Sequence, residues 1–199
     1  MDIYGIYREP LEKIMRDLAD RIGSTALSAE GEKLYDHISF RIKSDVSVRE
    51  KLEKRGLEAT AVNALRNIRD SIGIRVVCLF LDDVYECVRL IKTIPGVQLL
   101  EEKDYIYDAK PNGYRSYHMI LDVTGDAADV DGQTPGHFFA EIQLRTIAMD
   151  TWAALEHELK YKKDIADQEM IVRELHRCAN DLAACDVSMQ TLRRLIRDM

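Results

Sequence analysis

The apolar run GIRVVCLFL, at residues 73–81, constrains the fold of this chain more than any other segment. It is rich in β-branched and aromatic residues, and apolar residues fill it almost continuously instead of occupying every second position. Such a short run is typical of a β-strand that is buried inside a sheet. We therefore predict a buried strand here, in a sheet against which helices pack.

Other segments with the spacing of helices and strands surround this run. The apolar side chains of residues 6–22 recur on one stripe, which predicts a helix, and Ser24 and Ser28 are candidate caps of a second helix. On this pattern helices open the chain and the sheet begins at residue 73. The acidic segment 124–136 predicts an exposed hairpin loop. The remaining segments predict helices at 58–68, 82–94, 146–163 and 167–199, an edge strand at 97–107, and strands at 117–123 and 137–144.

The composition is that of a globular protein. A chain of 199 residues, 46% of them hydrophobic, can bury a substantial core, and 32% charged residues favour solubility. No apolar stretch approaches the roughly 20 residues of a transmembrane helix. The first residues also lack the features of a signal peptide, so we expect a cytoplasmic protein that does not enter a membrane. No segment has the composition of a linker, so we expect a single domain over residues 1–199.

The cysteine spacing argues against a disulfide-stabilised protein, and the net charge argues against a general nucleic-acid-binding protein. The cysteines form neither a CxxC pair nor the dense spacing of a disulfide scaffold, and their neighbours are apolar. The net charge of −7 argues against a surface that binds nucleic acid without regard to sequence, although a local basic pocket is compatible with it. We expect reduced core thiols at Cys78, Cys87, Cys178 and Cys185.

Basic residues gather in the segment 41–55, RIKSDVSVREKLEKR, where six cations face three carboxylates. Ser47 stands where it would cap a short helix that carries Lys51 and Lys54. A helix N-terminus flanked by basic side chains is a ready site for phosphate. The alternative is a solvated, charged helix face.

Two carboxylates interrupt strand-like surroundings. Asp70 comes directly before the apolar run, and Glu141 lies within FFAEIQLRT, where a strand places Glu141, Gln143 and Arg145 on one face. A buried carboxylate needs a matching partner, and Mg²⁺ prefers one or two carboxylates together with phosphates and water. The alternative is that each carboxylate forms a structural ion pair with Arg75 or Arg145.

Four motifs occur together along the chain. In order they read RIKSDVSVREKL, IRDSIGIRVVCLF, KDYIYDAKPNGYRSYH and EIQLRTIAMDTWAALEHELKYK. Over residues 34–162 this set resembles the synthetase domain of the RelA/SpoT family, in particular its small alarmone synthetases. The resemblance implies an α+β fold with a mixed sheet of about five strands, flanked by helices and related to nucleotidyltransferases. Residues 34–162 would form the core, and the helical segments 1–33 and 163–199 would serve oligomerisation.

The resemblance also implies a reaction, which is that of a GTP diphosphokinase. Members of the family transfer pyrophosphate from ATP to the 3′-hydroxyl of GDP or GTP, which makes the stringent-response alarmone (p)ppGpp; GMP is a further candidate acceptor. The chain contains no His-Asp dipeptide of the kind that the family's hydrolase domain carries, so we expect synthesis without hydrolysis. We also expect no requirement for a ribosome.

The resemblance also implies which residues bind the acceptor, the guanine nucleotide. Tyr114 matches the tyrosine that stacks on guanine, and Asp150 matches the position that reads the guanine edge. Asn112 and Gly113 would supply the turn that aims Tyr114, although the same dipeptide is also typical of a plain β-hairpin. The positions that would contact the phosphates, the ribose or adjoining groups are Lys103, Tyr105, Lys110, Asn112 and His118.

The resemblance likewise implies which residues bind ATP, the pyrophosphate donor. Arg41 and Arg75 match the arginines that sandwich adenine. Asp70 would bind Mg²⁺, and Glu141 would share the metal or take the proton from the 3′-hydroxyl. The triphosphate would be held by Lys43, Ser47, Lys51 and Lys54; Gln143 and Arg145 would orient Glu141, and Trp152 and His157 would be core or supporting residues.

Two other functions stay open. Some relatives are toxins that pyrophosphorylate adenine nucleotides or tRNA; the acidic net charge argues against tRNA but not against ATP as the acceptor. The same domain could also be a catalytically silent regulator that senses nucleotides or binds RNA. The presence of both Asp70 and Glu141 argues against silence.

The C-terminal segment 167–199 carries a heptad stripe, which predicts a helix with a buried seam. One alternative is that this seam packs on the first helix, at Leu11, Ile14, Leu18 and Ile22. A helix of about 34 residues, however, reaches roughly 50 Å, farther than the compact body beneath it. Small alarmone synthetases form homotetramers through terminal helices, so we expect a homotetramer, with an alarmone or RNA as a candidate allosteric ligand. The seam comprises Ile171, Leu175, Cys178, Leu182, Cys185, Met189, Leu192 and Ile196.

Overall fold

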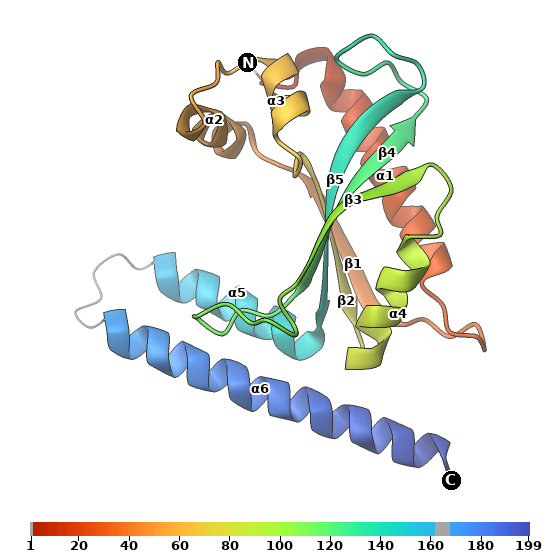
Figure 1. Ribbon diagram of the computed structural model, residues 1–199, viewed down its shortest axis with the longest axis vertical. Coiled ribbons are helices and arrows are strands. Elements are labelled where there is room, and N and C mark those ends of the chain that lie inside the picture. Colours follow the sequence, from red (N-terminus) through yellow and green to blue (C-terminus); the bar gives the residue numbers. More distant parts are fainter. Residues whose placement is uncertain (1, 162–167) are drawn as a thin grey trace.

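Five strands form one mixed sheet around which the helices are arranged (Figure 1). The computed structural model of the protein describes residues 2–161 and 168–199, so the expected end of the core at residue 162 lies outside the described residues. The strands are β1 (Tyr35–Ile42), β2 (Ile72–Cys78), β3 (Val97–Asp104), β4 (Tyr117–Gly125) and β5 (Gly136–Thr146). Their order is β1-β2-β5-β4-β3, with β2 parallel to β5 and the other neighbours antiparallel. The predicted α+β class is confirmed. The helices are η1 (Gly5–Tyr7), α1 (Arg8–Thr25), α2 (Asp45–Lys54), α3 (Ala61–Asn67), α4 (Leu81–Ile91), α5 (Ile147–Tyr161) and α6 (Gln168–Arg197).

The apolar run around residues 73–81 supplies a central strand, as predicted. β2 lies between β1 and β5, and its Ile72, Ile74 and Val76 side chains are buried in the main core. α1 and α4 cover this face of the sheet, whereas α2, α3 and α5 lie on the other side (Figure 1). Gly73 and Arg75 lie on the face of the sheet that carries α2, α3 and α5. They are only partly buried, because they line a cleft on that face. The sheet is therefore closed on one face and partly open on the other.

Several other predicted elements are confirmed with small changes of length. α1 buries the stripe that the periodicity indicates and packs on β1 and β2. α4, α5 and α6 form, and β3 lies at a sheet edge. β4 and β5 pair as antiparallel neighbours, so the acidic segment between them is a hairpin connection.

The first strand was not predicted, and the second helix that was predicted near Ser24 does not form. β1 has no clear alternation because none of its eight side chains is fully buried: five are exposed and three are partly covered. Pairing with β2, such as Arg41 opposite Gly73, makes it a strand. Ser24 lies in the last turn of α1. The Ser28 hydroxyl accepts from the backbone N–H groups of Glu30 and Glu32, which closes a loop.

α6 packs in a place that the sequence did not indicate. It lies against α5 and α4 and not against α1, which is occupied by the sheet (Figure 1). Of the predicted seam, Leu175 is buried and Ile171 and Leu182 are half-buried against α5. The other seam residues, Cys178, Cys185, Met189, Leu192 and Ile196, are exposed. The prediction of core thiols is correct for Cys78 and Cys87 and wrong for the exposed Cys178, Cys185.

The C-terminal half of α6 is fixed to α4 by polar contacts. The Gln190 side chain donates to Asp82 Oδ2 at 2.8 Å and accepts from the Asp82 N–H at 3.1 Å. Arg193 pairs with the buried Asp83 at 2.5 Å. These contacts hold α6 along one rim of the molecule. Within residues 2–161 and 168–199, no helix has both the length and the apolar character needed to cross a bilayer.

Candidate active site

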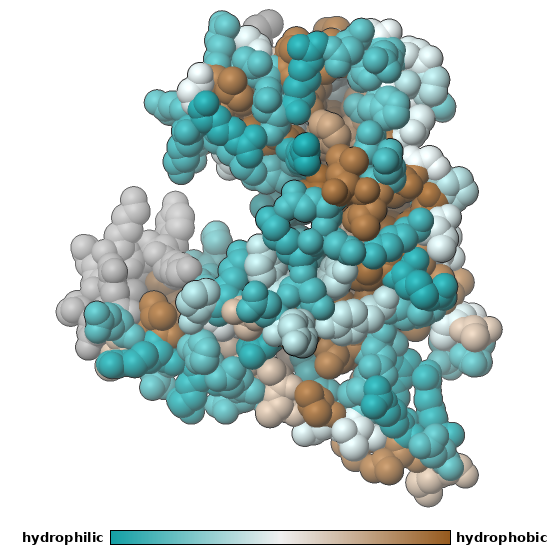
Figure 2. Space-filling view, in the orientation of Figure 1, coloured by the Kyte–Doolittle hydropathy of each residue, from teal (hydrophilic) through white to brown (hydrophobic). Residues whose placement is uncertain are grey.

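Two clefts open on the partly covered face of the sheet, and two carboxylates line both of them. The larger cleft has a volume of about 630 Å³ and the smaller one about 240 Å³. Asp70 and Glu141 belong to both linings. In Figure 2 the surface is hollowed between the part that carries α2 and α3 and the part that carries α5 and α6. We call Asp70 and Glu141 the shared carboxylates.

The strand register brings the functional side chains to one face. Gly73 of β2 lies opposite Glu141 of β5, and His118 of β4 lies opposite Gln143 of β5. Because alternate residues of a strand point to the same side, Glu141, Gln143 and His118 share the cleft face. Asp70 reaches it from the turn that precedes β2.

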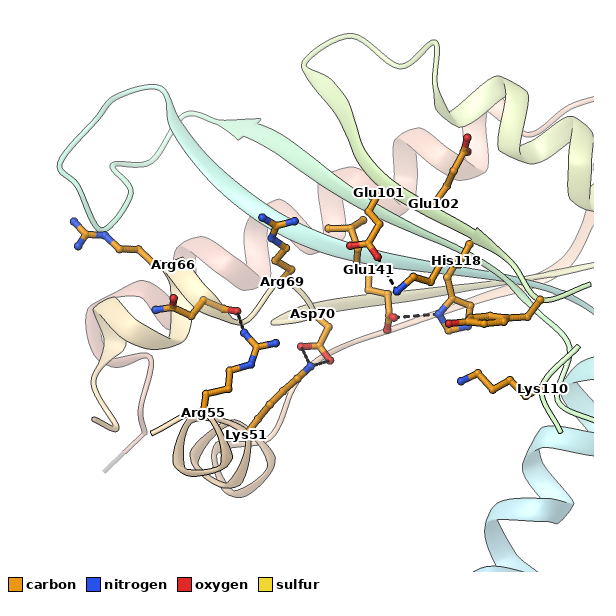
Figure 3. Close-up of a pocket in the computed structure, with 14 residues that line it drawn as sticks. Lys51, Arg55, Arg66, Arg69, Asp70, Glu101, Glu102, Lys110, His118 and Glu141 are labelled. Carbon is orange, nitrogen blue, oxygen red and sulfur yellow. Dashed lines mark hydrogen bonds and ion pairs between the residues drawn. The ribbon is translucent and has the colours of Figure 1, made fainter. Parts of the chain in front are cut away.

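Asp70 is held by two lysines from separate elements. Lys43, which follows β1, donates to Asp70 Oδ2 at 2.7 Å. Lys51 of α2 donates to both oxygens at 2.9 Å, as Figure 3 shows. Burial opposes ionisation of Asp70, but the hydrogen bonds from the two lysines outweigh it and hold the pKa of the carboxyl below its usual value. The site therefore presents an ionised carboxylate with cations on two sides.

Glu141 ends a chain of hydrogen bonds. Its Oε1 lies 3.2 Å from His118 Nδ1, and its Oε2 accepts from Gln143 Nε2 at 2.9 Å. The Tyr114 hydroxyl lies 2.8 Å from His118 Nε2 and accepts from Arg145 Nη2 at 2.7 Å. Burial raises the pKa of Glu141, but His118 and Gln143 outweigh it, so the net pKa is lowered. Glu141 is thus an oriented, ionised acceptor beside the larger cleft.

The alternative ion pairs of Asp70 with Arg75 and of Glu141 with Arg145 are not formed. Both arginines contact Asp150 instead, at 3.1 Å from Arg75 and 2.9 Å from Arg145. Asp150 lines neither of the two clefts. Its carboxylate therefore holds two arginines in place.

Residues 105–116, which connect β3 to β4, form what we call the acceptor loop. Its Lys110 Nζ lies 4.5 Å from the ring centroid of Tyr105 and 4.8 Å from that of Tyr114. Asn112 Oδ1 accepts from the Tyr114 N–H, and Asn112 Nδ2 donates to Glu156 of α5. The turn closes through Gly113 N–H and Lys110 O at 2.8 Å, so it is a turn within a longer connection and not a two-residue hairpin. Four of the expected acceptor residues, Lys103, Tyr105, Lys110 and His118, line the larger cleft.

Residues 40–166 match the family model described as "Region found in RelA / SpoT proteins". The chain belongs to the RelA/SpoT family. It is 34% identical over 164 residues to the GTP pyrophosphokinase YwaC of Bacillus subtilis, which is 82% of this chain and 76% of that protein. It is 27% identical to the GTP pyrophosphokinase YjbM of the same organism, over 95% of this chain and 88% of that protein.

Solved structures of RelA/SpoT proteins share the fold. A GTP pyrophosphokinase family protein from Streptococcus pneumoniae aligns with a TM-score of 0.81 and 29% identity, covering 96% of this chain and 93% of that one. The small alarmone synthetase 1 from Bacillus subtilis aligns with a TM-score of 0.81 and 25% identity, covering 97% of both chains. The resemblance that the four motifs indicate is confirmed.

On the expected donor side of this RelA/SpoT protein, the match is partial. Arg41, Lys43 and Arg75 line the smaller cleft together with Gln143, whereas Lys51 lines the larger one. Ser47 and Lys54 line neither cleft. Ser47 also does not cap α2: Ser44 does, by accepting from the Ser47 N–H at 3.3 Å.

The sequence reasoning missed Arg66 and Arg69 of the larger cleft, and it noted Arg55 in the basic segment 41–55 without giving it a role. All three line it; in Figure 3 Arg55 and Arg69 lie near the shared carboxylates, whereas Arg66 lies farther from them. Arg66 also pairs with Asp131 of the β4–β5 hairpin. The only available signal was the continuation of basic residues from segment 41–55 into α3 and the turn after it. Trp152 is buried as expected, whereas His157 is exposed and is not a core residue.

The shared carboxylates suit a magnesium ion that completes its shell with phosphate oxygens. Among the residues described, no group of three or more His, Cys, Asp or Glu side chains could hold a metal alone. Mg²⁺ commonly uses only one or two carboxylates and takes its other ligands from a nucleotide and water. Asp70 and Glu141 provide such hard oxygen donors where the two clefts meet.

Proposed function

We propose that this chain is a GTP diphosphokinase that transfers pyrophosphate from ATP to the 3′-hydroxyl of GDP or GTP and so makes (p)ppGpp in the cytoplasm. The observation that carries the proposal is the pair of cation-lined clefts that meet at Asp70 and Glu141. A transfer between two nucleotides needs two phosphate-binding sites that share one reacting centre. The relatives named GTP pyrophosphokinase support the same reaction.

ATP occupies the smaller cleft in this proposal. The guanidinium planes of Arg41 and Arg75 stack on adenine, a role for which a planar cation is better suited than an ammonium group. Lys43 and Lys51, which pair with Asp70, would also contact the triphosphate. Ser47 and Lys54 close on the phosphates from the same helix.

The guanine nucleotide occupies the larger cleft, with its base on the Tyr114 ring and its phosphates beside Lys103 and Lys110. The 3′-oxygen attacks the β-phosphorus of ATP, the bond from that phosphorus to the α–β bridging oxygen breaks, and AMP leaves. Glu141 accepts the proton of the hydroxyl, and His118 and Gln143 keep its oxygens oriented. Positioning and neutralisation of charge supply most of the rate in transfers of this kind.

Asp70, with Glu141 beside it, would hold Mg²⁺, which when bound neutralises charge on the transferring phosphates. Lys43 and Lys51, which donate to Asp70, offset its negative charge. Asp150 stabilises the site indirectly in this proposal, through Arg75 and Arg145.

Analysis of products tests the proposed reaction directly. We expect the purified protein with Mg²⁺ and ATP to convert GDP or GTP to a 3′-pyrophosphorylated product, with one AMP released per product. GMP, ATP alone and tRNA are tested in parallel. Product only from tRNA or from ATP as the acceptor would assign the chain to the toxin-type alternative. Binding of both nucleotides without any AMP would identify a silent nucleotide sensor.

We also propose that the chain forms a homo-oligomer, with a tetramer expected from the resemblance. An alarmone or RNA is the candidate allosteric ligand of that assembly. The outer side of α6 exposes large apolar side chains, among them Met189 at 52%, Leu192 at 52% and Ile196 at 71%. Contiguous apolar surface of this kind marks interaction sites.

Light scattering checks the assembly. We expect the unmodified chain to have the mass of an oligomer at micromolar concentration. Leu192→Glu plus Ile196→Glu should reduce that mass, because each change puts a charge on the exposed apolar side of α6 and leaves the core untouched. Val46→Glu, on exposed α2, is the matched control and should not change the mass. A soluble monomer for the unmodified chain would contradict the proposal.

A further inference from the structure

The acceptor loop is attached to α6 through a small apolar cluster that is separate from the main core. Trp152 of α5 and Leu175 and Ala179 of α6 are buried in this cluster, and Tyr114 packs against it. The Tyr114 and Trp152 ring centroids lie 6.4 Å apart, edge to face. The Trp152 indole N–H donates to Leu175 O at 2.8 Å, which fixes the ring to the α6 backbone. The residue proposed to stack on guanine thus rests on a surface that α6 helps to build.

Arg115, the neighbour of Tyr114, ties the loop to α6 by hydrogen bonds. Its Nη2 donates to Asn180 Oδ1 at 3.1 Å and its Nη1 to Ala179 O at 3.4 Å. Nη1 also lies 3.3 Å from Gly113 O, so one guanidinium joins both sides of the contact. The side chain points to the helix and lines neither cleft.

The backbone of the loop approaches α6 as closely as an unsubstituted residue allows. Gly113 has φ +91°, and a Cβ atom there would lie 2.5 Å from Ala179 Cβ and 3.2 Å from His176 Cα. A side chain at this position would therefore push the loop away from the helix. The helix itself is anchored at its other end by Gln190 and Arg193, so it offers a firm support.

We propose that Arg115 is a positioning residue for the guanine nucleotide: it fixes the acceptor loop on α6 and so holds the Tyr114 ring ready to stack. Ordering a loop during binding lowers affinity because the lost conformational freedom opposes it. A loop that is already fixed avoids this cost. The inference rests on the proposed function, since it concerns the acceptor site of that reaction.

Steady-state kinetics of Arg115→Ala test this role. The unmodified full chain is assayed first, with GDP varied at saturating ATP and then ATP varied at saturating GDP. We expect Arg115→Ala to raise KM for GDP about tenfold, as for loss of a charge-assisted hydrogen bond, and to leave kcat and KM for ATP within about twofold. Arg177→Ala is the matched control, because Arg177 is on α6 but pairs only with Glu174 and Asp181 in the contacts described, and it should leave KM unchanged.

A conservative variant and a double-mutant cycle separate positioning from general loss of structure. Arg115→Lys keeps a donor near the Ala179 carbonyl and should restore part of the affinity for GDP. Arg115→Ala combined with Asn180→Ala should cost less than the two single changes added together, because the residues act through one contact. Thermal unfolding of each variant verifies that it is folded.

Distinct results overturn the inference. Equal rises in KM for both nucleotides, a fall in kcat at unchanged KM for GDP, or the same change in Arg177→Ala would show that Arg115 does not position the acceptor loop. If the unmodified chain forms no product with any guanine nucleotide, the proposed function fails and the inference fails with it. If the unmodified chain forms product and Arg115→Ala leaves KM for GDP unchanged, the positioning role of Arg115 is overturned and the proposed function is not.

Discussion

Asp70→Asn is expected to lower turnover by about 100-fold or more while the protein stays folded. The substitution keeps the shape of the side chain and removes its charge, so the metal loses a ligand and Lys43 and Lys51 lose their shared counter-ion. Rates are measured under saturating ATP, GDP and Mg²⁺. Glu102→Gln is the control, since Glu102 lines the larger cleft but pairs with Lys92.

The pH dependence of stability gives a second measure of the same variant. Because the pKa of folded Asp70 is depressed, its pairing stabilises the fold above the pKa of the unfolded state, and this stabilisation is lost as pH falls through the lower folded value. The difference in Tm between the unmodified protein and Asp70→Asn should therefore be largest near neutral pH and shrink in acid. Near-normal turnover, or a Tm difference that does not change with pH, would contradict the role given to Asp70.

Glu141→Gln should lower turnover to a similar extent and also separate two roles of this carboxylate. If Glu141 serves mainly as the base, kcat stays low at every Mg²⁺ concentration. If it is mainly a metal ligand, the concentration of Mg²⁺ needed for half-maximal rate rises and excess Mg²⁺ recovers activity. Unchanged kinetics would remove Glu141 from the mechanism.

Tyr114→Ala is expected to weaken binding of GDP about ten- to a hundredfold, because a base stacked on an aromatic ring contributes about 1–3 kcal/mol. Binding of ATP should change little, since Tyr114 contacts Tyr105 and His118 of the larger cleft, whereas ATP is placed in the smaller one. Calorimetric titration with each nucleotide measures both effects. An equal loss for the two nucleotides, or a loss confined to ATP, would mean that the acceptor loop has been assigned to the wrong substrate.

Tyr114→Phe is the matched control for the ring. It keeps the stacking surface and removes the hydroxyl that accepts from Arg145 and contacts His118. We expect affinity for GDP to be nearly retained and kcat to fall, because Glu141 would lose part of the hydrogen-bond chain that orients it. A loss of affinity as large as that of the alanine variant would indicate that the hydroxyl, and not the ring, binds the nucleotide.

Local patterns were sufficient for elements whose burial is regular. The apolar run of β2 and the apolar stripe of α1 leave few alternatives, because the spacing of buried side chains along the sequence indicates whether the segment is a strand or a helix. β1 has no such pattern: it is an exposed edge strand, and backbone pairing with β2 makes it a strand. No local signal existed for that pairing. The prediction that Cys178 and Cys185 of α6 are core residues was wrong for a related reason. An apolar stripe on a helix does not indicate which neighbouring element, if any, covers it.

The sequence by itself determined the family, the mixed sheet and the residue types of the site, because the motifs are long and their order is unusual. It also indicated Asp70 and Glu141 as carboxylates that need a partner. Only the tertiary structure decided which partners they have. Lys43 reaches them from the residue after β1, Lys51 from α2 and His118 from β4, whereas the nearby Arg75 and Arg145 turn to Asp150. Side-chain direction and strand register, which depend on contacts between distant segments, made that choice.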